Sequence, residues 1–303
     1  MKVKKAIIPA AGFGTRVLPA SKAVPKEMLN IVDKPAIQYI VEEAVAAGIE
    51  DILIIVSRGK GIIEDHFDHA FELERQLEGK KGKEEIYEQV KAIANLANVY
   101  FVRQKQMKGL GHAVLCAKPF VGNEPFAVMY GDDVIISDKP VVGQLCDAYD
   151  KYGCGSVGVQ EVSREDIKKY CTLDVTPLEG RVMQCHNIIE KPTEEQIMSL
   201  YAILGRVVLP PEAFKLIEET PYDAKTGELY LSDAMVGLAK AGKLTAVDFE
   251  GVRYDMGNKL GIMKANCEVA LNHPEIGDSF KAYLKELVKT CLLYTSSEPT
   301  RLA

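Results

Sequence analysis

A short glycine-containing segment, Ala10-Ala11-Gly12-Phe13-Gly14-Thr15-Arg16, follows an apolar run near the start of the chain. Small residues let backbone N–H groups approach a phosphate closely, and successive N–H groups of this kind bind anions. The dinucleotide-binding fingerprint requires a third glycine where Val17 stands and a helix where Leu18 and Pro19 follow. No Gly-Lys-Ser/Thr sequence follows either. We therefore interpret the segment as a phosphate-binding loop of another type, with a plain turn as the alternative.

Basic residues follow this loop closely, at Arg16, Lys22 and Lys26. Several cations beside a glycine loop can hold a triphosphate. Lys26 comes after Pro25, whose fixed φ favours a constrained position for the charge. Any one of these cations alone is more typical of a solvated surface, so the prediction depends on their grouping.

The segment from Gln104 to His112 follows the third apolar run of the chain. The amide of Gln104 can donate to and accept from a base edge. Gly109 and Gly111 allow the backbone to approach a base and to begin a helix. His112 is more typical of a packing or capping residue than of a switch. The segment therefore predicts a site for the base of a nucleotide.

Carboxylates follow the run Phe126–Tyr130 at Asp132 and Asp133, and another lies at Asp255, between Tyr254 and Met256. Open parallel sheets bind ligands at the carboxyl ends of their strands. Mg²⁺ is held by carboxylates together with phosphate oxygens. Because Asp255 also lies in a glycine turn at the end of a strand-like run, we predict that Asp132 and Asp255 come from distant strands to one metal ion, with local capping of the turn as the alternative for the Asp pair.

Two further polar groupings differ in their expected roles. In Glu190-Lys191-Pro192, Glu190 can accept two sugar hydroxyls and Lys191 can meet a sugar phosphate. His66 and His69 have the spacing of one helix face, but no partner elsewhere in the sequence completes a metal site. We expect these histidines at the surface.

The elements that position these residues alternate between short apolar runs and helical patterns. Ala6–Ile8, Ile52–Val56, Val99–Val102 and Phe126–Tyr130 are apolar throughout, which is typical of buried parallel strands. The alternation predicts βαβ units and an α/β fold, with a mostly parallel central sheet flanked by helices.

The chain is expected to form a single domain over residues 1–289. Residues 59–98 form an insertion with two expected helices, because Glu78–Lys83 breaks the pattern. Residues 156–210 are expected to form a small antiparallel annex, in which Cys171–Thr176 and Val182–Ile189 are strands around a turn. Residues 290–303 match nothing before them and are interpreted as a non-native or unstructured tail.

Composition excludes several classes of protein. The 303 residues carry 37 Lys+Arg against 43 Asp+Glu, a net charge of −6, which argues against a nucleic-acid partner. The 7 cysteines form no CxxC pair, and no apolar run is long enough for a membrane span. These features predict a cytoplasmic protein without a membrane partner.

The motifs, in this order, resemble the sugar-nucleotide pyrophosphorylases. The insertion, with Ile63–Asp68 and Phe71–Glu74, makes the resemblance closest to the bacterial members that use UTP and glucose 1-phosphate. The resemblance covers roughly residues 3–289. It implies a Rossmann-like nucleotidyltransferase fold, Mg²⁺ dependence, formation of UDP-glucose and pyrophosphate, and a homo-dimer or homo-tetramer.

The resemblance also implies residue roles. Nucleotide-binding residues are Ala10, Ala11, Gly12, Gly14, Gln104 and Gly109; catalytic residues are Arg16, Lys26 and Lys191; metal ligands are Asp132 and Asp255; and sugar-binding residues are Gly158, Glu190, Lys191 and Asp133. Alternatives are a relative that uses dTTP, a non-catalytic nucleotide sensor and, from another class, an NAD-dependent oxidoreductase. Val17 and Pro19 weaken the last alternative.

Overall fold

A nine-stranded mixed sheet forms the centre of the protein in a computed structural model that describes residues 2–296. Across the sheet the strands are β5 (Asn98–Arg103), β4 (Asp51–Val56), β1 (Lys5–Pro9), β6 (Phe126–Met129), β11 (Tyr201–Leu209), β8 (Gly155–Glu161), β12 (Leu244–Asp248), β10 (Val182–Glu190) and β9 (Cys171–Glu179). Only β11 and β10 run against the other strands of this sheet. The predicted α/β fold with a mostly parallel central sheet is confirmed.

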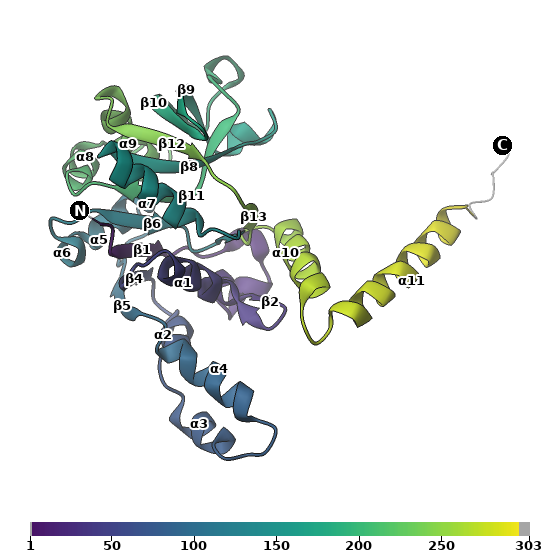
Figure 1. Cartoon of the computed structure of the whole chain (residues 1–303). Helices are drawn as coiled ribbons and strands as arrows, with labels where there is room; N and C mark the ends of the chain where they lie inside the picture. Colours follow the sequence, from purple (N-terminus) through teal and green to yellow (C-terminus); the bar gives the residue numbers. More distant parts are fainter. Residues whose placement is uncertain (1, 297–303) are drawn as a thin grey trace.

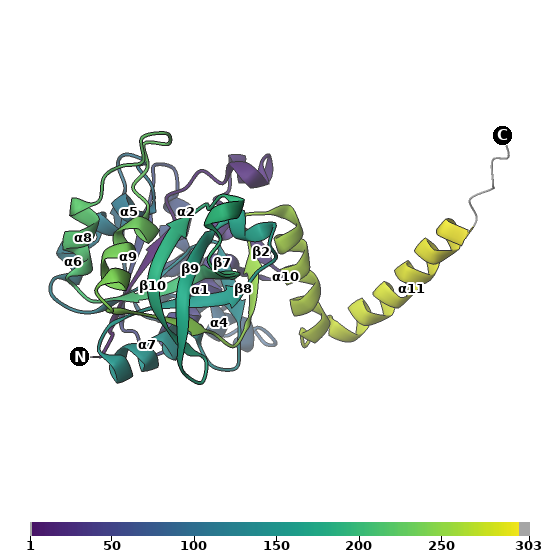
Figure 2. The same cartoon turned by 90° about the horizontal axis from the view of Figure 1, so that it is seen from above.

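Helices cover both faces of the sheet (Figures 1 and 2). One face packs against α1 (Ala36–Ala46) and α7 (Val141–Tyr152), while α10 (Lys259–Asn272) packs beside the sheet against β13 (Val252–Asp255) and β2 (Asn30–Ile31). The other packs against α5 (Leu110–Cys116), α6 (Lys118–Val121), α8 (Ala213–Glu219) and α9 (Leu231–Lys240). Because both faces are covered, the central strands are buried along almost their whole length, which explains their unbroken apolar sequences.

Two small antiparallel sheets lie outside the main sheet. One pairs β2 (Asn30–Ile31) with β3 (Lys34–Pro35), and the other pairs β7 (Asp133–Ile136) with β13 (Val252–Asp255). In the second sheet Asp133 is directly opposite Asp255. Backbone pairing therefore brings together two carboxylates that are far apart in the sequence.

The antiparallel strands expected in residues 156–210 are present, but they continue the main sheet. The strand β8 pairs with β11, and the hairpin of β9 and β10 forms the edge of the sheet. The pairing of β11 with β8 shifts register between Ile203 and Val207, where Gly205 has a φ of +73°. A bulge of this kind bends a strand and commonly lies beside a functional site.

The insertion between β4 and β5 holds three helices, so the expectation of two was wrong. They are α2 (Gly61–Phe67), α3 (Phe71–Leu77) and α4 (Glu84–Ala94), and α3 and α4 extend away from the sheet (Figure 1). The expected break lies between α3 and α4. A second break lies at Asp68, whose backbone is extended, and no glycine or proline marks it in the sequence.

The helix α11 (Gly277–Ser296) follows α10 and projects from the body (Figures 1 and 2). Its backbone stays helical past residue 289, which differs from the unstructured tail expected from there, because no glycine or proline interrupts residues 290–296. Residues 297–303 of that predicted tail lie outside the described residues. Among residues 2–296, no helix is long and apolar enough to cross a membrane.

An almost fully buried ion pair joins α1 to the centre of the sheet. Arg206 on β11 has no exposed surface, and its Nη2 lies 2.6 Å from Oε2 of Glu43, which is 7% exposed. Its Nε also donates to Glu43, at 3.0 and 3.1 Å. Glu43 accepts a further hydrogen bond from the backbone N–H of Val142. Because both groups are removed from water, the charge of Arg206 and the charge of Glu43 are each stabilised mainly by the other.

We predict that Glu43→Gln lowers the free energy of unfolding by about 3–5 kcal/mol, because it leaves the Arg206 charge buried without a carboxylate. Glu42→Gln on the same helix is the matched control. Glu42 pairs with Lys34 at a site where both side chains are about one-third exposed, so its loss costs about 1 kcal/mol or less. Urea denaturation measures both values, and equal midpoints for the two variants would contradict the prediction.

Candidate active site

The predicted binding residues follow the carboxyl ends of neighbouring strands. Gln104 follows β5, Ala10 follows β1, and Asp132 lies just beyond β6. Backbone hydrogen bonds between adjacent strands continue into these loops: Gln104 N–H donates to Val56, Ala10 N–H to Ile55, and Gly131 N–H to Pro9. The three loops therefore lie along one edge of the sheet, where open parallel sheets bind ligands.

The loop after β1 folds back on itself through the short 3₁₀ helices η1 (Thr15–Val17), η2 (Ala20–Lys22) and η3 (Lys26–Met28). Gly14 has a φ of +66°, and a Cβ there would lie 3.2–3.3 Å from the Cβ atoms of Ser21 and Lys26. The Ser21 hydroxyl donates to the Gly14 carbonyl at 2.7 Å. Gly14 thus brings the loop back so that Lys26 lies beside it.

Asp132 lies between two cations from that loop. Lys26 Nζ donates to Asp132 Oδ2, and Arg16 Nη2 lies 3.7 Å from the same oxygen. Burial raises the pKa of Asp132, but Lys26 and Arg16 outweigh it and hold the pKa below its usual range. Burial likewise lowers the pKa of Lys26, and Asp132 more than reverses that effect. Asp132 and Lys26 are therefore both charged near neutral pH.

Asp255 completes this group from β13. Its Oδ2 lies 3.5 Å from Arg16 Nη1, and its Oδ1 accepts a hydrogen bond of 2.7 Å from the Gly257 N–H. A Cβ on Gly257 would lie 2.7 Å from Asp255 Oδ1 and 3.0 Å from Asp132 Oδ2, and it would also clash with the Arg16 guanidinium. Only glycine leaves the space between the two carboxylates open.

The donor set fits a small divalent cation. Among residues 2–296, no group of three or more His, Cys, Asp or Glu side chains is placed to hold a metal ion. Two carboxylates, completed by substrate phosphate oxygens and water, are the usual protein share of a magnesium site. Asp132 and Asp255, with the open space beside Gly257, match that share in the number and type of their ligand groups.

Asp133 faces a different partner. Its Oδ1 lies 2.6 Å from Arg253 Nη2, and Arg253 Nη1 donates to the Tyr170 hydroxyl at 3.2 Å. Burial raises the pKa of Asp133 to about 6, with Arg253 opposing and the Asp132 and Asp255 charges adding to the shift. A Cβ on Gly205, in the bulge of β11, would lie 2.7 Å from the Asp133 Cβ. The bulge therefore packs directly against Asp133.

A buried ion pair lies beneath the glycine loop. Lys60 Nζ donates to Glu27 Oε2 at 2.8 Å and also to the Ala10 carbonyl. Both side chains are almost fully buried, and burial raises the pKa of Glu27 and lowers that of Lys60. Because Glu27 follows Lys26 directly, this pair ties together the start of the loop, the Lys26 turn and the entry to the insertion.

The predicted base-binding residues lie together, although their glycines have an additional task. Gln104 is buried, and its Nε2 lies 3.2 Å from the Gly109 carbonyl and 2.9 Å from His112 Nδ1. A Cβ on Gly109, where φ is +89°, would lie 2.8 Å from the backbone of Leu229. Gly109 and Gly111 thus allow the segment around Leu229 to pack closely against them, and they also lie at the start of α5.

Glu190 and Lys191 lie beside a separate cavity of about 200 Å³, which Tyr130, Tyr170 and Glu190 help to line. Glu190 Oε2 accepts a hydrogen bond of 2.8 Å from the Ser232 hydroxyl, and burial raises the pKa of Glu190. Lys191 has a φ of +46°.

The Lys191 ammonium lies 3.3 Å from the Tyr230 hydroxyl and 4.8 Å from the centre of its ring. Burial lowers the pKa of Lys191, but Tyr230 and the nearby carboxylates raise it overall. Lys191 therefore remains a cation, and it contacts Tyr230, which lines the cavity.

The structure brings Arg16, Lys26, Asp132 and Asp255 into one cluster. Asp133, which follows Asp132 in the sequence, contacts Arg253 instead. Gly158 lies apart, buried in β8, where a Cβ would meet Phe249 and the Arg206 carbonyl, and it does not line the cavity beside Glu190. Among the described residues, the two histidines of the insertion form no metal site: His66 contacts Gln38 and His69 contacts Glu74.

Sequence reasoning missed Glu27, Lys60, Arg253, Gly205 and Gly257. Three of them adjoin motifs that were recognised: Glu27 follows Lys26, and Arg253 and Gly257 flank Asp255 by two positions. A search of those flanks for charges and glycines would have found them. Nothing in the sequence near Lys60 or Gly205 distinguishes either from a surface lysine or a turn glycine.

Comparisons with known proteins show which proteins this chain resembles over nearly its whole length. A UTP–glucose-1-phosphate uridylyltransferase of Staphylococcus epidermidis is 50% identical over 286 residues, which is 94% of this chain and 99% of the relative. A structure described as UTP-bound UGPase from Acinetobacter baumannii is 38% identical, with a TM-score of 0.84, and covers 94% of this chain and 99% of that chain.

A UDP-glucose pyrophosphorylase complexed with UDP-glucose is 40% identical, with a TM-score of 0.79 and the same coverage of 94% and 99%. These relatives confirm the predicted resemblance to the sugar-nucleotide pyrophosphorylases. Residues 5–272 match the family model described as nucleotidyl transferase. This chain therefore belongs to the nucleotidyl transferase family.

Proposed function

We propose that this protein transfers the uridylyl group of UTP to glucose 1-phosphate, giving UDP-glucose and pyrophosphate. One observation carries the proposal: Arg16, Lys26, Asp132 and Asp255 converge at the carboxyl edge of the parallel strands. The direction of the chemistry is supported by relatives that are described with UTP and with UDP-glucose. Two negatively charged reactants need such a cluster in order to meet.

Each reactant has a binding region in this proposal. Ala10, Ala11, Gly12 and Gly14 hold the nucleotide through the loop backbone, with Gln104 and Gly109 at the base. Glu190 accepts sugar hydroxyls, with Asp133 and Gly158 as further sugar-binding residues. Gly158 is the least supported of these, because its surroundings are apolar side chains and backbone.

We propose Mg²⁺ as the metal, held by Asp132 and Asp255. When bound, it neutralises charge on the phosphates of UTP and of the leaving pyrophosphate. Arg16 lies against both carboxylates, and Lys26 donates to Asp132. In this proposal, both cations contact phosphate oxygens of UTP beside the two carboxylates.

The transfer is a displacement at phosphorus. A phosphate oxygen of glucose 1-phosphate forms a bond to the α-phosphorus of UTP, and the bond from that phosphorus to the bridging oxygen of the β-phosphate breaks. Pyrophosphate leaves with the electron pair. The attacking phosphate is already ionised near neutral pH, so no general base is required. Lys191 orients this phosphate, while Arg16 and Lys26 stabilise charge on the triphosphate.

We propose that the binding partners of this chain are UTP, glucose 1-phosphate and further copies of the chain itself, in an assembly of two or four copies. The net charge of −6 argues against a nucleic-acid partner, because such a partner requires many cations to neutralise its phosphates. The dTTP-using and non-catalytic alternatives share the fold, and they differ in the nucleotide selected and in whether pyrophosphate is released.

We predict that pyrophosphate release with glucose 1-phosphate is at least tenfold faster with UTP than with dTTP, CTP, ATP or GTP. A coupled pyrophosphate assay measures the five rates. Lys191→Ala is the inactive control, and it should still bind UTP by calorimetry because Lys191 lies outside the cluster around Asp132. A preference for dTTP would indicate a thymidylyltransferase, and absence of pyrophosphate with every nucleotide would indicate a non-catalytic protein.

We predict that Asp132→Asn reduces the Mg²⁺-dependent rate on the order of a hundredfold, because one charged metal contact is lost at the reacting phosphates. The measurement is the initial rate across a range of MgCl₂ concentrations. Asp138→Asn, an exposed acid a few residues further along, provides the matched control. Wild-type rates and wild-type Mg²⁺ dependence in Asp132→Asn would remove Asp132 from the metal site.

We predict that Lys60→Met weakens UTP binding about tenfold, since the Ala10 carbonyl and Glu27 lose a charged hydrogen-bond donor. Calorimetry measures the Kd for UTP, and steady-state kinetics should show an unchanged KM for glucose 1-phosphate. Lys60→Met alone leaves the Glu27 carboxylate buried without a cation, which lowers the stability of the protein. The double variant Glu27→Gln/Lys60→Met removes that charge, so any weakening of UTP binding that remains is due to the position of the loop. Lys34→Met, which breaks an ion pair whose side chains are about one-third exposed, is the control, and equal Kd values for it and Lys60→Met would contradict the prediction.

A further inference from the structure

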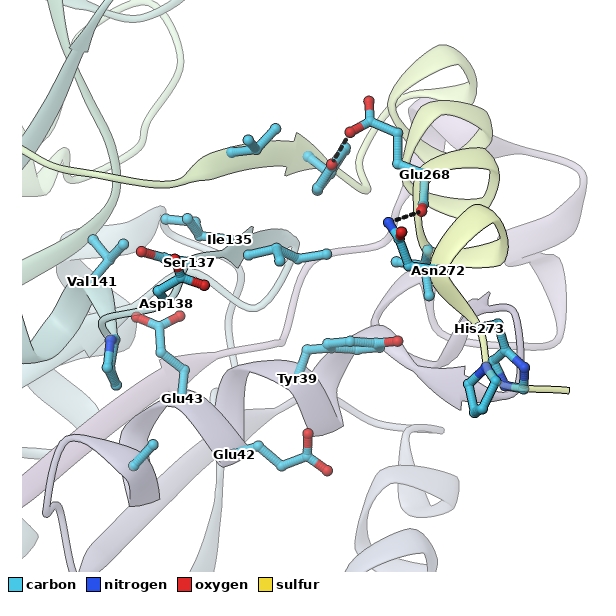
Figure 3. Close-up of a pocket in the computed structure, with 17 residues that line it drawn as sticks. Tyr39, Glu42, Glu43, Ile135, Ser137, Asp138, Val141, Glu268, Asn272 and His273 are labelled. Atoms are coloured by element: carbon cyan, nitrogen blue, oxygen red, sulfur yellow. Dashed lines mark hydrogen bonds between the residues drawn. The ribbon is translucent and has the colours of Figure 1, made fainter. Parts of the chain in front are cut away.

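A cavity of about 730 Å³ lies between α1, the β7–β13 sheet and α10, and none of the predicted substrate-binding or metal-binding residues lines it (Figure 3). Glu42 and Glu43 lie on its α1 side, and Glu268 lies on α10. No lysine or arginine is present among the described residues that line it. A sugar phosphate is held by cations at its phosphate, so this acidic cavity does not suit one. The smaller cavity at Glu190 differs, because Lys191 lies beside it and is held at both ends of its side chain.

The backbone of Lys191 is fixed in an uncommon conformation. Its φ is +46°, in the left-handed region that residues other than glycine rarely adopt, and Pro192 follows it. Its N–H donates to the Tyr170 carbonyl at 2.7 Å. Backbone of this kind persists only where its surroundings hold it, and it is concentrated at ligand-binding sites. The Lys191 side chain therefore starts from a defined position.

The tip of this side chain is held by Tyr230. The Lys191 ammonium lies 3.3 Å from the Tyr230 hydroxyl and 4.8 Å from the centre of the ring, so it is nearer the hydroxyl. A neutral hydroxyl positions a cation without neutralising it. A carboxylate in its place would compete with a phosphate for the ammonium. The contact therefore leaves the charge of Lys191 available to a ligand.

A chain of hydroxyl groups that ends at a carboxylate sets the direction of this hydrogen bond. The Tyr230 hydroxyl donates to Thr226 Oγ1 at 3.1 Å, and the Thr226 hydroxyl donates to Asp223 Oδ1 at 2.9 Å. Hydrogen bonds from the backbone and side chain of Thr226 lower the pKa of Asp223, so this carboxyl is ionised and only accepts. Each hydroxyl has one proton to donate. The Tyr230 oxygen therefore accepts from Lys191.

The segment that carries Tyr230 is anchored on both sides. The N–H of Leu229 donates to the Lys108 carbonyl, and the Leu229 carbonyl accepts from the Gly111 N–H, each at 2.8 Å. Tyr230 itself is the N-cap residue of α9, which begins at Leu231. The Tyr230 ring thus extends from backbone that is fixed by its neighbours, and it can restrain the lysine that it contacts.

We propose that Tyr230 is a positioning residue, which together with Thr226 and Asp223 holds the Lys191 ammonium where the phosphate of glucose 1-phosphate binds. This inference rests on the function proposed above. A lysine side chain without such a restraint samples many rotamers and loses that freedom when it binds a phosphate. Tyr230 restrains the ammonium beforehand, so it strengthens the binding of glucose 1-phosphate and leaves the binding of UTP unchanged.

Steady-state kinetics of Tyr230→Phe test the proposal, since this change removes the hydroxyl and keeps the ring. We expect KM for glucose 1-phosphate to rise about tenfold, the usual effect of losing a hydrogen bond to a charged group, while KM for UTP stays within about twofold. Thr226→Val breaks the chain one step further from Lys191 and should raise the same KM. Thr226→Ser keeps the hydroxyl and should retain the wild-type value. Tyr222→Phe, at an exposed tyrosine of the same loop, is the matched control.

The pKa of Lys191 provides a second readout that does not need the reaction. Burial lowers this pKa, and the hydrogen bond to the Tyr230 hydroxyl is the largest of the contacts that raise it, ahead of the charges of Glu190 and Glu228. Tyr230→Phe should therefore lower the pKa of Lys191, and Tyr222→Phe should not. Competitive labelling of the full chain with acetic anhydride across a pH range, read by mass spectrometry, measures it.

The two readouts separate this inference from the proposed function. With active enzyme, an unchanged KM for glucose 1-phosphate in Tyr230→Phe, an equal rise in KM for both substrates, or an unchanged pKa of Lys191 would overturn the positioning role. If the wild type releases no pyrophosphate with any nucleotide, the proposed function fails. The pKa then decides alone: a lower value in Tyr230→Phe supports the restraint of Lys191, and the wild-type value overturns it.

Discussion

The ion pair between Lys26 and Asp132 is the contact on which the candidate active site depends. It joins two segments that are 106 residues apart, the loop after β1 and the turn after β6. Neither residue could be buried alone in its charged form without a large penalty. Arg16 and Asp255 extend the pair into a balanced group of two cations and two anions. The edge of the sheet thus keeps two cations and two anions close together in their charged forms, where charged reactants can contact them.

Two further ion pairs lie away from this edge of the sheet, and they hold segments of backbone in position. Lys60 and Glu27 hold the Ala10 carbonyl from below, and Arg206 with Glu43 fixes β11 beside its bulge. That bulge brings Gly205 against Asp133. The acidic and basic residues at the site are therefore held by a second set of buried ions, and each of these pairs links an element of the sheet or its loops to a different part of the chain.

Strands that are unbroken apolar runs could be predicted from the sequence, whereas a strand whose apolar run is interrupted by glycine or by a charged residue could be missed. Strands such as β1 and β4 are apolar throughout because helices cover both faces, so their pattern is visible locally. The strand β11 was missed because Gly205 and Arg206 interrupt its apolar run, and Arg206 is buried only through Glu43, 163 residues away. The strands β7 and β12 and the helix α7 were not predicted either. The candidate site followed from local motifs and from family resemblance, but Lys60 depends on a partner that no motif contains.

The order of strands across the sheet also determines when it can be completed during synthesis. The strand β12 (Leu244–Asp248) inserts between β8 and β10, both made earlier, and joins them by backbone hydrogen bonds. Until it leaves the ribosome, the hairpin of β9 and β10 has no neighbour on that side and presents an open strand edge. Asp255 emerges later still. A nascent chain can therefore form its glycine loop early, but the charged cluster of Arg16, Lys26, Asp132 and Asp255 is complete only when nearly all of the domain has been translated.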